Sequence, residues 1–304
     1  MNPIPEIFNS KLLLFGEYGL MFDAIALSVP YTRFYGSLEF DTDGRYRESN
    51  AEIRNFFAYL TSLNENKLHY PFDLKDLKED LNQGLCFNSN IPHQYGLGSS
   101  GALVAALFSR YAASSLEKDQ LPIQSLKEDF SLLESYFHGK SSGLDPLVSF
   151  LNQPLLLGED KTIQPLAFDL SKSGWPITLI DTKTTGATGP LVQHFIDCMK
   201  LTGFNKAFLA EYIPASNGCI QSLLSGDKTS FFIYLRQLIE FELQYLKEMF
   251  PLDFGALVKE ALNQQVYIKL LGSGGGGYLL AFAPDEDILN LWSERKAFPL
   301  IKVA

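Results

Sequence analysis

The chain has 304 residues, of which 46% are hydrophobic and 20% are charged, as in ordinary globular proteins. This length allows a sizeable core, in one large domain or two smaller ones. The net charge of -10 provides no basic field for nucleic-acid phosphates, so we expect no nucleic-acid partner. Cys86, Cys198 and Cys219 are widely spaced and form no zinc motif, which fits a reducing compartment.

The first residues and the hydropathy pattern favour a cytoplasmic protein. The N-terminus has neither a basic segment nor an apolar segment of the kind found in signal peptides. No apolar run approaches the roughly 20 residues that a transmembrane helix needs. We therefore expect no membrane partner.

The predicted elements of the first half alternate between strands and helices. Apolar runs predict strands over 12–15, 25–29 and 33–40, with the second strand ending at Pro30. Helical periodicity follows over 50–63, 72–81, 101–116 and 126–137. The segments 147–150 and 155–157 are predicted to be extended.

Beyond about residue 160 the pattern becomes more helical. Strands are predicted over 176–181, 267–271, 278–282 and 298–303, and helices over 189–201, 204–224, 228–249 and 286–294. This order indicates an α+β fold with two closely packed lobes, residues 1–160 and 161–304.

The stretch Gly96-Leu97-Gly98-Ser99-Ser100-Gly101 leads into the helix predicted over 101–116. Glycines let backbone N–H groups approach an anion, and the positive end of a helix dipole favours negative charge. No Lys-Ser/Thr pair follows the last glycine, so the stretch is not a Walker A loop. Taken alone, it is equally well explained as a serine-capped tight turn.

Three further segments carry patterns of chemical interest. Lys11 and Glu17 lie at the two ends of the first predicted strand, and Glu134 and Asp145 flank a Gly-Lys-Ser-Ser-Gly turn. Residues 272–277 contain five glycines between two predicted strands. A hairpin turn rarely needs so much glycine, so a loop that a phosphate or substrate approaches is favoured. Singly, each charged residue is better explained as a surface or turn residue, but their joint occurrence favours a site.

In this order the four segments resemble those of the GHMP kinase superfamily, and within it those of the mevalonate kinases. The resemblance covers about residues 10 to 280. It implies a two-lobed fold with an N-terminal nucleotide-binding α+β lobe and a C-terminal ferredoxin-like lobe. It also implies ATP and Mg²⁺ as cofactors.

The resemblance assigns a role to each candidate residue. Asp145 corresponds to the general base, and Lys11 would lower the pKa of Asp145 and offset charge on the moving phosphoryl group. Ser100 and Glu134 would supply the hydroxyl and carboxylate oxygens that magnesium prefers. The ATP phosphates would lie on Gly96, Leu97, Gly98, Ser99, Ser100 and Gly101. The substrate or phosphate loops would include Glu17, Thr188, Gly272, Ser273, Gly274 and Gly275.

Two residues in or near these segments, Thr188 and His138, also have simple structural explanations. Thr188 is equally well explained as a helix cap. His138 is expected to pack or to form a hydrogen bond rather than to act as a base.

The sequence departs from the mevalonate kinase pattern on the acceptor side. Gly186 stands where mevalonate kinases carry arginine or a similar basic residue, and Tyr18 stands where they carry histidine. Ser141 replaces a frequent proline. A carboxylate substrate would lose a bidentate partner without the guanidinium.

The sequence therefore predicts a kinase that transfers the γ-phosphoryl group of ATP to an alcohol on a small metabolite, with mevalonate as the first candidate. Phosphomevalonate, homoserine or a sugar as acceptor, a family decarboxylase, and a non-catalytic ligand-binding protein are the alternatives. A homodimer is left open.

Overall fold

The computed structural model divides the chain into two units, each with its own helices. It describes residues 6–22, 24–63, 67–112, 117–172, 174–186, 188–251, 254–296 and 298–303. The strands β1 (Ile7–Phe15) and β2 (Ala26–Phe40) each contribute residues to both units. The sheet that they form with β3, β4 and β5 has the order β1-β2-β4-β5, and β3 pairs with β2.

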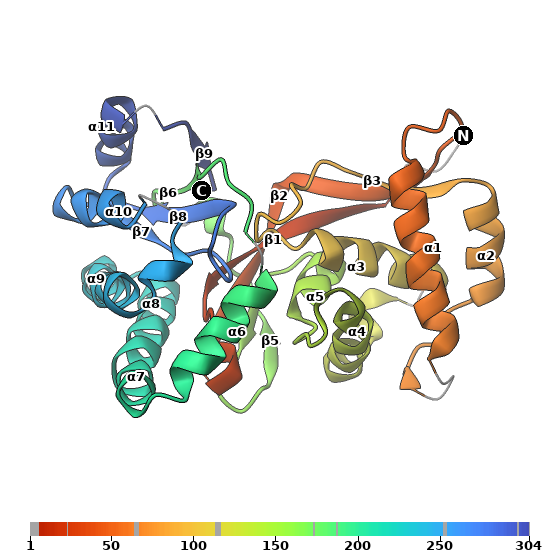
Figure 1. Cartoon of the computed structure of the whole chain (residues 1–304), viewed down its shortest axis with the longest axis horizontal. Helices are drawn as coiled ribbons and strands as arrows, with labels where there is room; N and C mark the ends of the chain where they lie inside the picture. Colours follow the sequence, from red (N-terminus) through yellow and green to blue (C-terminus); the bar gives the residue numbers. More distant parts are fainter. Residues whose placement is uncertain are drawn as a thin grey trace. The chain divides into compact units, whose positions relative to one another are not determined.

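The first unit joins Met1–Lys11, Pro30–Pro92 and Leu97–Gln153. Its part of β2 pairs antiparallel with β3 (Leu85–Ser89). Its helices are α1 (Arg47–Ser62), α2 (Leu74–Asn82), α3 (Ser99–Tyr111), α4 (Ile123–His138) and α5 (Leu144–Leu151), with a 3-10 turn at Lys118–Gln120. Helix α3 packs against α4 and α5 around the clustered rings of Phe108, Phe130 and Phe150 (Figure 1). Phe108 lies in the last turn of α3, so this ring cluster anchors the C-terminal end of that helix.

The second unit joins Leu12–Val29, His93–Gly96 and Pro154–Ala304. Within it, β4 (Leu155–Leu157) pairs with the start of β2 and with β5 (Ile163–Pro165). A second sheet contains β6 (Ile177–Asp181), β7 (Tyr267–Lys269), β8 (Tyr278–Phe282) and β9 (Leu300–Lys302). All of its pairings are antiparallel, in the order β7-β8-β6-β9.

Helices fill the connections of this second sheet. They are α6 (Thr188–Met199), α7 (Thr202–Ala207), α8 (Ile213–Ser225), α9 (Lys228–Tyr245), α10 (Phe254–Asn263) and α11 (Glu286–Lys296). A π-helical turn, Phe208–Tyr212, joins α7 to α8, and short 3-10 turns lie at Gly19–Phe22, Leu170–Lys172 and Lys247–Met249. Helices α8 and α9 lie side by side, and α9 and α10 pack against β7 (Figure 1). The strand order and the βαββαβ succession are those of a ferredoxin-like lobe, as predicted.

The structure corrects two predictions from the sequence and adds one helix that was not predicted. Residues 147–150 are not extended but helical, because Leu144, Leu147 and Val148 share one buried helix face and Pro146 lies in the first turn, where its missing N–H is tolerated. Pro30 does not end a strand, since β2 continues through it between two separately paired segments. Helix α10 was not predicted from the sequence.

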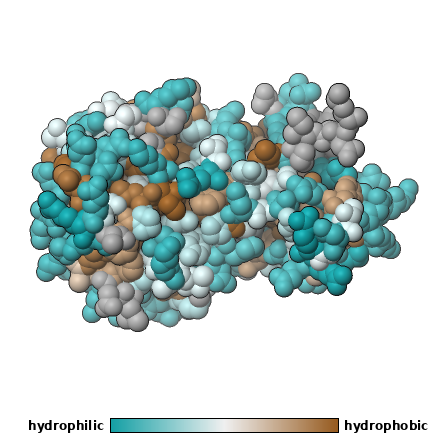
Figure 2. All heavy atoms as spheres, turned by 90° about the horizontal axis from the view of Figure 1, so that it is seen from above, coloured by the Kyte–Doolittle hydropathy of each residue, from teal (hydrophilic) through white to brown (hydrophobic). Residues whose placement is uncertain are grey.

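The two units do not follow one cut in the sequence, because residues 12–29 and 93–96 group with 154–304. The predicted boundary between lobes at residues 160 and 161 stays a prediction. Among the described residues, no helix combines the length and apolar character needed to cross a bilayer. The face drawn in Figure 2 is largely hydrophilic, with its hydrophobic atoms in small groups.

Candidate active site

Lys11 and Asp145 form an ion pair within the first unit. The Lys11 Nζ atom lies 3.0 Å from Asp145 Oδ2, and the lysine is buried while the carboxylate is partly exposed. Lys11 projects from β1, and Asp145 lies in the first turn of α5, which begins after the left-handed residue Gly143. The sequence prediction that these two residues lie together is therefore consistent with the geometry. The arrangement places a partly exposed carboxylate, a group that can act as a proton acceptor, next to a buried cation.

Two glycines at the start of α3, the N-cap Gly98 and Gly101 in the first turn, are needed for close packing around this pair. A Cβ atom on Gly98 would lie 2.9 Å from Lys11 Cγ, and Gly98 is in the left-handed region with φ of 73°. A Cβ atom on Gly101 would lie 2.9 Å from the backbone and Cβ atoms of Asp145. The backbone N–H of Lys11 also donates to the carbonyl of Leu97 at 3.0 Å. The glycine motif thus brings the start of α3 directly against Lys11 and Asp145.

The N-terminus of α3 has the properties of an anion site. Its N-cap residue, Gly98, has no side chain to cap the helix, and no acidic residue occurs in the first turn. The first N–H groups of a helix lack intrahelical partners and carry the positive end of the dipole. Within the first unit, these donors begin at the residues that pack on the ion pair. Gly96, the first residue of the predicted cradle, belongs to the second unit.

Glu134 is a buried carboxylate near the same ion pair. It lies on α4 with 3% of its surface exposed, and Ser141 Oγ donates a hydrogen bond to its Oε2 atom. Burial, together with the negative charge of Asp145, raises its pKa from 4.5 to about 8. A bound cation would favour the ionised form. The predicted role of Glu134 as a magnesium ligand therefore stays a prediction with which this carboxyl group is chemically compatible.

Ser100 and His138 are joined by a hydrogen bond. The two polar atoms, Ser100 Oγ and His138 Nε2, lie 3.0 Å apart. Burial lowers the pKa of His138, and Lys11 acts in the same direction while Asp145 opposes it. The prediction that His138 forms a hydrogen bond is confirmed. Its spacing of four residues from Glu134 on one helix is the signal that places it near the site.

The two predicted magnesium ligands provide oxygen donors, which is the kind of ligand that magnesium prefers. The described part of the chain contains no group of three or more His, Cys, Asp or Glu side chains suited to a metal. Magnesium retains waters and commonly takes only one or two protein carboxylates plus phosphate oxygens. One buried carboxylate, Glu134, and one hydroxyl, Ser100, are consistent with that mode of binding.

The glycine loop of the second unit connects β7 to β8. Five of its residues have positive φ, namely Gly272, Gly274, Gly275, Gly276 and Gly277. The N–H groups of Gly275 and Gly277 donate to the carbonyls of Met249 and Thr184, at 2.5 and 2.6 Å. The segment is thus both a hairpin connection and a packed loop. These two N–H groups bind backbone carbonyls rather than facing a ligand.

Gly186 packs directly on this loop. A Cβ atom there would lie 2.6 Å from the Gly274 carbonyl oxygen and 3.2 Å from the Gly276 nitrogen. An arginine at this position would require the glycine loop to move. The departure from the mevalonate kinase pattern is therefore built into the packing of the second unit. The side chain of Thr188, the first residue of α6, lies outside the described residues.

Glu17 and Tyr18 have buried partners in the second unit. Glu17 is 2% exposed and its Oε1 atom lies 2.5 Å from Lys269 Nζ. The Tyr18 hydroxyl donates to the Ser273 carbonyl at 2.7 Å. The sequence analysis did not identify Lys269 as part of this arrangement. A single lysine inside the apolar run 266–271 was nevertheless a signal of a buried ion pair, because a buried charge needs a partner.

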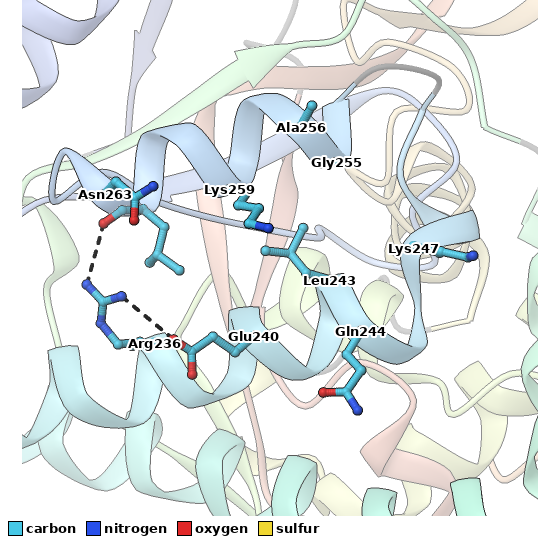
Figure 3. Close-up of a pocket in the computed structure, with 10 residues that line it drawn as sticks. Arg236, Glu240, Leu243, Gln244, Lys247, Gly255, Ala256, Lys259 and Asn263 are labelled. Carbon is cyan, nitrogen blue, oxygen red and sulfur yellow. Dashed lines mark hydrogen bonds and ion pairs between the residues drawn. The ribbon is translucent and has the colours of Figure 1, made fainter.

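A separate pocket lies between α9 and α10 and contains none of the predicted site residues (Figure 3). Its volume is about 550 Å³, and Lys259 points from α10 towards Leu243 of α9. Arg236 is held there by an ion pair with Glu240 at 3.7 Å and by the Leu262 carbonyl at 3.4 Å. Its cations are exposed or already paired, so the cavity does not resemble the site around Lys11 and Asp145.

Comparison with known proteins supports the resemblance. The model of the family "GHMP kinases N terminal domain" matches residues 63–153. A mevalonate kinase of Pyrococcus horikoshii is 25% identical over 97% of this chain and 91% of that protein.

Solved structures show the same fold. A mevalonate kinase of L. major in complex with R-mevalonate has a TM-score of 0.67 and 18% identity, covering 99% of this chain and 95% of that one. A phosphomevalonate kinase of Streptococcus pneumoniae in complex with phosphomevalonate and AMPPNP has a TM-score of 0.69 and 16% identity, covering 99% and 100%. From these matches and the ordered motifs, we conclude that residues 63–153 match the N-terminal domain of the GHMP kinases and that the chain as a whole is similar to the mevalonate kinases.

Proposed function

We propose that this protein transfers the γ-phosphoryl group of ATP to the hydroxyl group of a small metabolite, with Mg²⁺ as cofactor and mevalonate as the first acceptor to test. The observation that carries the proposal is the ion pair between Lys11 and Asp145, packed through Gly98 and Gly101 against the uncapped start of α3. This arrangement joins a proton acceptor, a cation and an anion site within one unit. Phosphoryl transfer depends mainly on such positioning and charge stabilisation.

In this mechanism the acceptor hydroxyl oxygen attacks the γ-phosphorus, the bond from that phosphorus to the β,γ-bridging oxygen breaks, and ADP leaves. Asp145 accepts the hydroxyl proton. Lys11 pairs with the Asp145 carboxylate and offsets negative charge on the transferred group. The N–H groups at the start of α3 bind phosphate oxygens.

Ser100 and Glu134 would hold the magnesium ion in this proposal. When bound, the ion neutralises phosphate charge during transfer. Burial and the negative charge of Asp145 raise the pKa of Glu134, and a bound cation would favour its ionised form. His138 holds the Ser100 hydroxyl in place through its hydrogen bond.

Gly186 favours a second candidate, a kinase of the same mechanism with a different acceptor. The packing around Gly186 excludes an arginine unless the glycine loop moves. A carboxylate acceptor would then need another cation. The acceptors of this second candidate are phosphomevalonate, homoserine and sugars, of which only a sugar has no carboxylate and so needs no replacement for the arginine.

An acceptor panel with ATP and Mg²⁺ tests both candidates. We expect ADP release to be fastest with mevalonate, and faster turnover of phosphomevalonate, homoserine or galactose would favour the second candidate. Release of carbon dioxide would indicate a decarboxylase. Ligand binding without turnover of any acceptor would contradict the kinase proposal.

Two further expectations accompany the proposal. A homodimer would appear as twice the chain mass of 34.0 kDa in native mass measurements. The cytoplasmic location predicted from the sequence would be checked by fractionation of the source cells.

A further inference from the structure

The turn Gly16–Tyr18 in the second unit binds residues 269–273, which include the beginning of the glycine loop. Two adjacent side chains of this turn, Glu17 and Tyr18, each bond to a different point of residues 269–273. Neither contact follows from the family motifs. Together they tie a turn near the beginning of the chain to a loop more than 250 residues later, since the Tyr18 and Ser273 positions differ by 255.

The first tie is a buried ion pair. Lys269 is completely buried, and its Nζ atom lies 2.5 Å from Glu17 Oε1 and donates to the Leu270 carbonyl, also at 2.5 Å. Glu242 of α9 accepts the N–H of Leu270 at 3.1 Å. Both backbone polar groups of Leu270 therefore bind buried ionisable side chains, those of Lys269 and Glu242. Such groups are costly to bury unless paired, so they favour one arrangement of the chain where the loop begins.

The second tie is the Tyr18 hydroxyl group. It donates to the Ser273 carbonyl oxygen at 2.7 Å, and the tyrosine ring stacks on Phe195 of α6 with centroids 4.3 Å apart. Tyr18 is 7% exposed and has φ of 57°, a left-handed conformation that a bulky residue adopts only when its surroundings hold it there. The hydroxyl is thus committed to the loop backbone rather than presented to solvent.

The loop is anchored from another element as well. The Gly275 N–H group donates to the Met249 carbonyl, and Met249 Sδ lies 3.5 Å from the Tyr18 hydroxyl. The tyrosine therefore reaches the loop and the segment that holds the next turn of that loop. Removal of one hydroxyl should loosen the loop without opening the core, because the ring stack on Phe195 remains.

We propose that Tyr18 is a positioning residue, which with the Glu17–Lys269 pair holds the glycine loop Gly272–Gly277 in the conformation that the acceptor binds. This inference rests on the proposed kinase function and on the assignment of the loop to the substrate side. If the loop binds the acceptor only while the Tyr18 hydrogen bond holds it, loss of that bond lowers the fraction of molecules that can bind the acceptor. The apparent dissociation constant of the acceptor then rises in proportion.

Tyr18→Phe tests the proposal, with Tyr111→Phe as the matched control. Tyr111 is a similarly buried tyrosine whose hydroxyl donates to Asp80 in the first unit at 2.7 Å. One hydrogen bond of typical strength corresponds to a change of about five-fold in an equilibrium. We therefore expect the acceptor KM of Tyr18→Phe to rise by up to about five-fold, with kcat and the ATP KM unchanged. Tyr111→Phe should leave all three unchanged.

Hydrogen–deuterium exchange of residues 270–280 in the ligand-free protein provides a readout that does not depend on turnover. We expect faster exchange there in Tyr18→Phe and not in Tyr111→Phe. Unchanged exchange of residues 270–280 in Tyr18→Phe would show that the Tyr18 hydroxyl does not hold the loop. Faster exchange with an unchanged acceptor KM would show that Tyr18 does not position the loop for the acceptor. A fall in kcat at constant KM values would indicate only fewer folded molecules. If the wild type turns over no acceptor, the proposed function fails, while the exchange result still decides whether the tie exists.

Discussion

Glu134→Gln should stabilise the ligand-free protein, and more strongly as the pH rises. The carboxylate of Glu134 is buried, with a pKa raised to about 8 by burial and by the charge of Asp145. Between its ordinary value and about pH 8, the folded chain binds a proton that the unfolded chain has released. Stability therefore falls as the pH rises through this range. Glutamine carries no charge to bury and removes this dependence.

The raised pKa sets the size of the effect. Each pH unit between the ordinary pKa of 4.5 and about 8 costs about 1.4 kcal/mol. Full ionisation of Glu134 thus destabilises the folded chain by about 5 kcal/mol, and near pH 6 the cost is about 2 kcal/mol. We expect the advantage of Glu134→Gln over the wild type to grow by about 2 kcal/mol between about pH 6 and pH 8, since the group is half ionised at the upper limit.

Urea unfolding without nucleotide or metal, repeated across this pH range, measures the difference. Glu242, whose pKa burial also raises to about 8, contributes to both proteins and cancels in the comparison. Glu52→Gln, at an exposed position of α1, is the control and should give a constant difference. Parallel stability curves for the wild type and Glu134→Gln would refute the reasoning.

Three further perturbations address the roles of the site residues. Asp145→Asn should reduce kcat by about 10²–10⁴-fold with little change in ATP affinity, because it removes the proton acceptor, and near-normal turnover would remove Asp145 from this role. Ser100→Ala should shift the magnesium titration of activity to higher concentration, and an unchanged titration would argue against Ser100 as a ligand. Gly98→Ala should lower the unfolding free energy by about 1–3 kcal/mol, because a left-handed residue gains a Cβ atom against Lys11, and an unchanged urea midpoint would contradict this.

Local patterns in the sequence were sufficient for most of the fold. The periodicity that predicts helices and strands depends on residues three, four or two positions apart, so α3, α4 and the strands of the second sheet were predicted correctly in kind. The prediction for 147–150 was wrong because a short apolar run has no clear period. Helix α10 was not predicted for a similar reason, because it is short and follows α9 closely in the sequence.

The residues of the candidate site could be predicted from the sequence, but the contacts between them could not. The ordered motifs were enough to single out Lys11, Asp145, Glu134 and the glycine stretch, since each motif is contiguous and its order is visible in one dimension. Their assigned roles stay predictions. Only the tertiary structure shows that Gly98 and Gly101 are required by contact with Lys11 and Asp145, because packing across distant segments leaves no periodic signal.

By itself, the sequence determined the class of fold and the resemblance to the mevalonate kinases, because these follow from local periodicity and from motif order. The tertiary structure decided which charges are buried and what pairs with them, as for Lys269 with Glu17 and Tyr18 with Ser273. Burial and pairing depend on which distant residues exclude water from a group, and no local pattern specifies that. The same physical reason makes the pKa of Glu134 and the packing of Gly186 properties of the folded chain alone.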